Sequence, residues 1–263
     1  MTTLRIASLD QLAHFDRCVE IQIAVWGYSD GDVVPRLVFL LAQRIGGQVM
    51  GAFDGDSIVG FAMALPGYRE GTPYLHSHML AVLPAYRNTG LGRRLKLAQR
   101  DDALTRGFEL MEWTFDPLEI KNAHLNLHRL GAIARRYAPN FYGPSSSPLQ
   151  GGLPTDRLYA EWWLRSPRVL ERLAGTQPSL GAITTRVAVP AAISLWKQNP
   201  DQRTLAVDLQ TSNRIALQSA FAGGLAILDY ERDAEGNGTY LLGPYTAPPP
   251  APSPESQAAH DPN

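Results

Sequence analysis

The sequence predicts an α/β fold in which a mixed sheet carries helices on both faces, followed by a smaller C-terminal α/β unit. Two observations support this class. Short apolar runs alternate with amphipathic helical patterns in the order β, α, α, β, β, β, α, β, α, β, β up to about residue 165. Beyond a stretch with plausible linker composition, the chain then gives one strand, two helices and two strands.

Local signals define the elements of the first hundred residues. Residues 4–7 form a short strand, and Ser8 with Gln11 is a capping-box signal for a helix that ends at Gly27. The predicted apolar face of this helix consists of Leu12, Phe15, Val19, Ile23 and Trp26. Pro35 opens a second helix, which Gly46-Gly47 closes. Asp54-Gly55-Asp56 predicts a hairpin between strands at 48–53 and 57–65, and 72–83 is a further strand.

The next elements follow the same logic. A helix starts in the turn at 87–92 and runs to about Arg106, and 110–117 is a strand. A helix over 121–130 is stopped by Gly131, and the segments 132–143 and 156–164 are strands.

We predict four segments from these patterns: a domain at 1–165, a linker at 166–180, an extension at 181–245 and a disordered tail at 246–263. The tail is rich in Pro, Ser and Ala and has almost nothing to bury. An extension of about 65 residues buries little of its own surface. It is therefore expected to pack on the first domain or on a second subunit, as in a homodimer.

Composition excludes several classes of partner. The chain has 24 basic and 25 acidic side chains and a formal charge of -1, which argues against nucleic acid or an anionic membrane. Cys18 is the single cysteine, so it is expected to be a buried thiol rather than half of a disulfide. No signal-peptide pattern or uninterrupted apolar stretch of about 18 residues is present, and we expect a cytoplasmic protein.

The turn at residues 87–92, Arg-Asn-Thr-Gly-Leu-Gly, indicates an anion site. Gly90 and Gly92 let the backbone approach a ligand, and the helix that begins there adds the positive end of its dipole. From Arg87 to Arg106, six basic side chains accompany two acidic ones. A phosphate group is the anion expected, and a solvated basic face is the alternative.

This turn resembles the pyrophosphate loop of the GNAT acyltransferase superfamily, Arg/Gln-x-x-Gly-x-Gly/Ala. It follows an apolar strand, as in that family, and the element order from Leu4 to about Leu164 is similar. The resemblance implies a mainly antiparallel sheet and transfer of an acyl group from acetyl-CoA or another acyl-CoA to a small-molecule amine, without a metal. The coenzyme A contacts it implies are Leu80, Ala81 and Val82 for the pantetheine, and Arg87, Asn88, Thr89, Gly90, Leu91, Gly92 and Arg93 for the pyrophosphate.

The resemblance also suggests catalytic residues. Period-2 alternation places Tyr74, His76, His78, Leu80 and Val82 on one strand face. The family's glutamate base corresponds to His76, and His78 lies beside it; the Val82 N–H would bind the thioester oxyanion. The position of the family's tyrosine acid is Leu127, so Tyr137 or Tyr142 would have to supply that proton.

Further positions have two readings. Asn122 could contact the pantetheine or cap a helix. Asp30 and Asp32 could shape the acceptor pocket or be solvated turn residues. His76 and His78 on a strand and His124 and His128 on a helix suggest zinc, but no cysteine or HExxH pattern accompanies them, and we expect no metal.

Two readings of the function remain open. The segment 114–143 resembles a subgroup of predicted acyltransferases, some linked to N-succinylation of amino acids, so succinyl transfer is an option beside acetyl transfer. The rival is a non-catalytic acyl-CoA sensor or scaffold, which the missing tyrosine supports.

Overall fold

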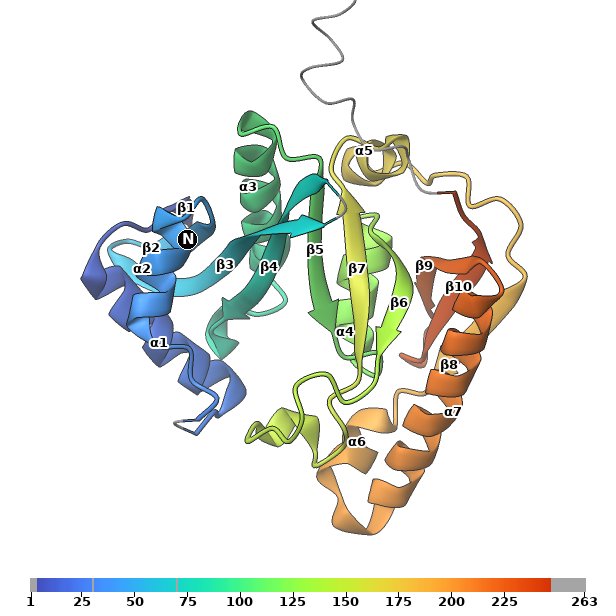
Figure 1. Cartoon of the computed structure of the whole chain (residues 1–263). Coiled ribbons are helices and arrows are strands. Elements are labelled where there is room, and N and C mark those ends of the chain that lie inside the picture. Colours follow the sequence, from blue (N-terminus) through green and yellow to red (C-terminus); the bar gives the residue numbers. More distant parts are fainter. Residues whose placement is uncertain (1–3, 30, 70, 247–263) are drawn as a thin grey trace, which may run out of the picture.

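The computed structural model describes residues 4–29, 31–69 and 71–246, and these form one ten-stranded sheet (Figure 1). The strand order is β1-β2-β3-β4-β5-β7-β6-β9-β10-β8. The first seven strands are β1 (Arg5–Ser8), β2 (Gln48–Asp54), β3 (Ser57–Arg69), β4 (Thr72–Val82), β5 (Leu110–Phe115), β6 (Ile133–Ala138) and β7 (Arg157–Trp163). The extension adds β8 (Thr185–Val189), β9 (Leu225–Arg232) and β10 (Gly238–Pro244). Every neighbouring pair is antiparallel except β4 and β5, so the mixed, mainly antiparallel sheet is confirmed.

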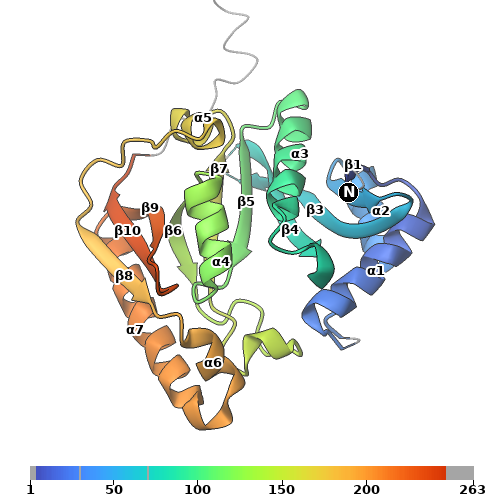
Figure 2. The same cartoon turned by 180° about the vertical axis from the view of Figure 1, so that it is seen from behind.

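The helices cover both faces of the sheet. They are α1 (Leu12–Trp26), α2 (Arg36–Arg44), α3 (Leu91–Thr105), α4 (Ile120–Ala123), α5 (Pro167–Ala174), α6 (Ile193–Gln198) and α7 (Arg203–Ala222). Helices α1 and α2 pack on one face of β2–β4, while α3 packs on the other face, on the same side as α4 (Figure 2). Helices α3 and α4 therefore flank the parallel pair β4–β5 on the same side of the sheet (Figure 2).

Several boundaries follow directly from sequence chemistry. Gly27 ends α1 in the left-handed conformation with φ of 64°, and Pro35 is the N-cap of α2. Gly55 takes φ of 59° in the turn between β2 and β3, as the hairpin signal predicts. Cys18 is fully buried, which confirms the expected structural thiol.

Three local predictions are wrong. Gln11, not Ser8, is the N-cap of α1, and it makes no side-chain cap bond. Leu12 and Ile23 are 50% and 45% exposed, because α1 turns Phe15, Cys18 and Ile21 inward instead. The helix predicted over 121–130 is α4 followed by a π-helical turn, His124–Arg129, although Gly131 does end it with φ of 77°.

The extension continues the sheet of the first domain. Strand β9 joins β6 through a single pair, Ala134↔Ile227, and both halves contribute to one apolar cluster that includes Trp162 and Tyr240. The predicted linker contains α5, whose Val169 is buried in this same cluster. Almost all of the predicted tail lies outside the described residues.

Candidate active site

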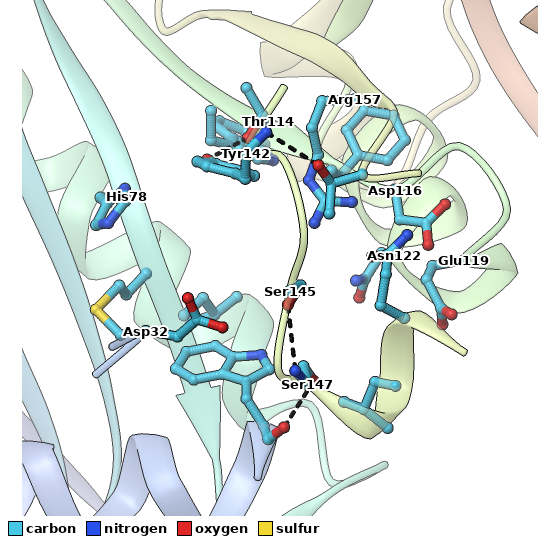
Figure 3. A pocket seen from close by; sticks show the side chains of 18 of the residues that line it. Asp32, His78, Thr114, Asp116, Glu119, Asn122, Tyr142, Ser145, Ser147 and Arg157 are labelled. Atoms are coloured by element: carbon cyan, nitrogen blue, oxygen red, sulfur yellow. Dashed lines mark hydrogen bonds between the residues drawn. The ribbon is translucent and has the colours of Figure 1, made fainter. Parts of the chain in front are cut away.

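A cleft opens where β4 and β5 separate. The two strands are paired only at Leu75↔Met111 and His76↔Glu112. Beyond these pairs the strands leave a cavity of about 380 Å³, lined by residues 77–80 of β4, by residues 113–115 of β5 and by Asp116, which follows β5. Parts of α4, the loop between α1 and α2, and the loop between β6 and β7 complete its walls (Figure 3).

A β-bulge at His78 shapes the β4 wall of this cleft. Opposite β3, Met79 pairs with Met63 while Ser77 pairs with Ala64, so His78 has no partner of its own. An extra residue reverses the alternation that follows it. Leu80 and Val82 therefore pack toward α3 rather than on the face of His76, and the predicted shared face is wrong beyond His78.

The bulge brings one of the two strand histidines into the cleft. His78 lines the cavity, whereas His76 does not, and their ring centroids are 6.2 Å apart. Burial, and then the neighbouring His78, lowers the pKa of His76 to about 4. Partial burial also lowers the pKa of His78 below its ordinary value. Both rings are therefore neutral near pH 7, the form in which an imidazole accepts a proton.

On the edge of β4 that faces away from β3, two backbone N–H groups have no hydrogen-bond partner among the described residues. Leu83 N donates to Val59 O, so the pair Gly60↔Val82 is of the non-hydrogen-bonded type and the Val82 N–H points away from β3. By the same alternation the Leu80 N–H points away from β3, while the backbone of Ala81 bonds to Phe61. Leu80 and Val82 can thus bind a ligand through their backbone N–H groups. The backbone of Ala81, which the sequence predicts to contact the pantetheine, is instead occupied by its pairing with Phe61.

The glycine turn has the geometry of an anion site. Gly90 is the N-cap of α3 with φ of 83°, and Asn88 has φ of 62°. Arg94 N donates to Gly90 O, which leaves the preceding amides at the helix N-terminus without an intrahelical acceptor. Arg87 donates from Nε to Val82 O, and Arg93 Nε is buried without a partner among the described residues. The turn lies at the other end of β4 from His76, so a ligand bound here can extend along the strand to the bulge.

The tyrosines expected near the leaving group differ in position. Leu127 is fully buried in the core, as its apolar character requires. Tyr142 lines the cleft, and its hydroxyl is 2.9 Å from Thr114 Oγ1. Tyr137 does not line it: its hydroxyl donates to Asp156 at 2.6 Å, and burial raises its pKa well above the ordinary value. Of the two tyrosines, the structure brings Tyr142 to the cleft.

The wall opposite His78 is polar (Figure 3). Asn122 lines it from α4, and since the N-cap of that helix is Glu119, the capping role considered for Asn122 is excluded. Asp116 and Glu119 also line the cleft, and both are bound by Lys197 from the extension, at 3.0 and 2.8 Å. The extension thus contributes to the support of this wall.

Two loops close the outer end of the cleft. Asp32 accepts hydrogen bonds from the Ser146 backbone and hydroxyl at 2.7 and 2.6 Å, and these bonds lower its pKa. Ser147 donates to Trp26 O at 2.6 Å. Asp32 therefore ties the loop between α1 and α2 to the loop between β6 and β7, whereas Asp30 lies outside the described residues.

Sequence reasoning missed three cations of the cleft. Lys96 and Arg157 line it, and Lys197 supports its wall. Lys96 belongs to a run of basic residues that resembles a solvated helix face, and Lys197 lies 81 residues away from its partner Asp116. Only the fold brings these side chains to the site.

The four histidines considered for zinc do not form a cluster of metal ligands with other described residues. Within the described part of the chain, no group of three or more His, Cys, Asp or Glu side chains could hold a metal ion. His124 and His128 stack on each other with centroids 4.7 Å apart, and His128 Nδ1 lies 3.2 Å from Asp229 of the extension. Among the same residues, no helix is long and apolar enough to cross a membrane.

Comparison with known proteins agrees with this architecture. The separated β4 and β5, the bulge and the glycine turn at a helix N-terminus together form the candidate site, which follows β4. Residues 15–132 match the model of the acetyltransferase (GNAT) family. A comparison with curated protein sequences gives no match.

Several solved structures resemble this chain at low sequence identity. The ribosomal-protein-S18-alanine N-acetyltransferase from Escherichia coli is 14% identical, with a TM-score of 0.50 over 69% of this chain and 100% of that chain. The acetyltransferase yncA from Salmonella typhimurium, solved with acetyl-CoA, is 21% identical over 63% and 96%, with a TM-score of 0.49. An aminoglycoside acetyltransferase from an uncultured soil metagenomic sample, solved with sisomicin, is 20% identical over 45% and 82%, with a TM-score of 0.41. These likenesses concern the fold alone.

Proposed function

We propose that the chain is an N-acyltransferase that moves an acyl group from an acyl-CoA to an amine by direct attack in a ternary complex. The observation that supports this most is the continuous path from the glycine turn along β4 to the cleft at His78. The match of residues 15–132 to the acetyltransferase (GNAT) family model supports the reaction class.

The donor would bind along β4. The amides of residues 88–92 suit the pyrophosphate of coenzyme A, because they lie at the positive end of α3. The amide expected of Arg87 is occupied, because Arg87 N donates to Pro84 O at 3.2 Å. The pantetheine would follow the free N–H groups of Leu80 and Val82, with Asn122 on the facing wall. The thioester would then reach the cleft beside His78.

The reacting groups follow from this placement. His78 is the base that we favour, with His76 as the alternative, because only His78 lines the cavity. The amine proton passes to the imidazole as nitrogen attacks the thioester carbon. Leu80, which lines the cleft, offers an oxyanion donor closer to His78 than the Val82 N–H of the initial hypothesis. Tyr142 is better placed than Tyr137 to protonate the leaving thiolate.

The substrates themselves belong to the proposal. Acetyl is the default acyl group, and succinyl is the option given by the resemblance of residues 114–143. For the acceptor we favour an amino acid, because Arg157 lines the cleft and forms no ion pair with the other described residues. A guanidinium in that position can bind a carboxylate. A cytoplasmic location and a homodimer remain expectations.

The second candidate function is an acyl-CoA sensor without turnover, which the buried Leu127 at the usual tyrosine position favours. Free thiol released from acyl-CoA in the presence of a panel of amino acids and other amines separates the two. Amine-dependent thiol release establishes the transferase. Calorimetric binding of coenzyme A without release by any amine would favour the sensor, and absence of binding would refute both.

A further inference from the structure

Two lysines of the described chain are almost completely buried near the cleft, and their surroundings differ. Lys96 is 2% exposed and Lys197 is 5% exposed. Lys197 donates to the carboxylates of both Asp116 and Glu119. Lys96 has no carboxylate partner among the described residues: its Nζ donates to Ser77 Oγ at 2.7 Å and lies 3.6 Å from the centroid of the Trp113 ring.

Lys96 occupies the inner end of the cleft. His76 and Glu112 form the last pair before β4 and β5 separate. Ser77 directly follows His76 in the chain, and Trp113 directly follows Glu112. The Lys96 side chain reaches this point from α3 and lines the cavity together with Ser77 and Trp113. Its amino group is therefore fixed where the two strands begin to diverge.

An unpaired ammonium in such a place is unfavourable. Removal of a charge from water is costly unless an opposite charge compensates for it. Burial accordingly lowers the pKa of Lys96 well below its ordinary value, whereas the two carboxylates raise the pKa of Lys197 although burial opposes this. A ligand carboxylate beside Lys96 would supply the missing partner and favour the protonated amine.

The direction of the donor decides which ligand group reaches Lys96. A coenzyme A with its pyrophosphate at residues 87–92 runs along β4 toward the bulge, so its acyl end approaches the point of strand separation. The acceptor would bind on a different side of the cleft, at Arg157. An acetyl group is short and uncharged and would leave Lys96 without a partner.

We propose that Lys96 is a specificity-determining residue that binds a carboxylate at the end of the acyl chain, so that the donor is the coenzyme A thioester of a dicarboxylic acid. This inference rests on the proposed function, because it requires coenzyme A to bind along β4. Trp113 and Ser77 hold the ammonium in place through the ring face and the hydroxyl.

Isothermal titration calorimetry on the full chain tests the proposal. Succinyl-CoA and butyryl-CoA have acyl chains of equal carbon number, and only the former ends in a carboxylate. We expect the wild-type protein to bind succinyl-CoA at least tenfold more tightly than butyryl-CoA. In Lys96→Met this preference should disappear, while free coenzyme A binds as it does to wild type.

Proton uptake gives a second readout. Titrations in two buffers of different ionisation enthalpy should show that the wild type takes up a proton with succinyl-CoA and not with butyryl-CoA. His76 and His78 also titrate near the cleft, so the Lys96→Met variant serves as the control: there the difference in uptake between the two thioesters should vanish.

The outcomes distinguish the role of Lys96 from the proposed acyltransferase function. Equal affinity of the wild type for the two thioesters, with tight binding of free coenzyme A, would overturn the role of Lys96 and leave the proposed function intact. Failure to bind any coenzyme A compound would refute the proposed function itself. The wild-type comparison stays decisive if the variant does not fold.

Discussion

Replacement of Lys197 by methionine should destabilise the protein strongly, although Lys197 belongs to the extension rather than to the family domain. The side chain is 5% exposed and bridges Asp116 and Glu119. Removal of one partner of a buried ion pair costs roughly 3–5 kcal/mol, because the remaining charge stays buried without compensation. Lys197→Met keeps the length of the side chain, so lost packing contributes little.

The surroundings favour the lower end of that range. The Glu119 side chain is 46% exposed and can regain water, and Asp116 keeps a 2.8 Å hydrogen bond from Leu118 N. We therefore expect a loss of about 3 kcal/mol in the free energy of unfolding. In a chain of this size about 1 kcal/mol corresponds to roughly 2–4 °C, so the melting temperature should fall by about 6–12 °C.

Urea unfolding and thermal melts of the full chain measure this loss. Arg186→Met is the matched control, since Arg186 and Glu231 form a pair in which both side chains are more than half exposed, and its loss should stay below about 1 kcal/mol. Adding Asp116→Asn to Lys197→Met should restore part of the stability. A Lys197→Met protein as stable as Arg186→Met would refute the reasoning.

Three further predictions concern the extension and the site. Truncation after Pro167 should yield an aggregating or less heat-stable protein, because β6 loses its neighbouring strand β9 and becomes an exposed edge. Light scattering and melting curves measure this effect, and a soluble, equally stable and active product would contradict the prediction. Gly92→Val should weaken calorimetric binding of coenzyme A at least about tenfold with little loss of stability, because a Cβ there meets only Leu80, at 3.8 Å; Gly90→Val should also strain the backbone at φ of 83°. His78→Ala should lower turnover by about 100-fold with unchanged coenzyme A affinity. Burial lowers the pKa of His78 below its ordinary value of 6.5, so the acidic limb of the wild-type pH profile should lie below pH 6.5 and should change in the variant. Full activity of His78→Ala, with loss of activity in His76→Ala, would transfer the role to His76.

Much of the fold follows from local signals in the sequence. Asp54-Gly55-Asp56 requires a tight turn with positive φ, and Gly27 ends a helix in the left-handed conformation, so both boundaries could be predicted. The turn at Gly90 could be predicted for the same reason. These features depend on residues that are close together in the sequence.

The geometry of the candidate site depends on features that local patterns do not show. The bulge at His78 leaves the apolar alternation of β4 apparently intact, so the reversal of faces is visible only once β3 is paired with it. Lys96 is indistinguishable in the sequence from its basic neighbours until α3 packs on β4 and β5. The predicted apolar face of α1 includes Ile23 because this residue fits the helical period. The side of α1 that is buried in the fold is instead the one that carries Cys18 and Ile21.

The single residue pair between β6 and β9 affects the order in which the chain can fold. Ala134 pairs with Ile227 across 93 residues, and Tyr240 donates its hydroxyl hydrogen to Pro117 O across 123 residues. Such contacts between distant parts of a chain form slowly, and a ribosome releases the extension after the strands on which it packs. A nascent chain can assemble β1 to β7 early, but Asp116 and Glu119 must wait for Lys197 before their wall of the cleft is neutralised. Translation itself thus delays completion of this wall until the extension has been made.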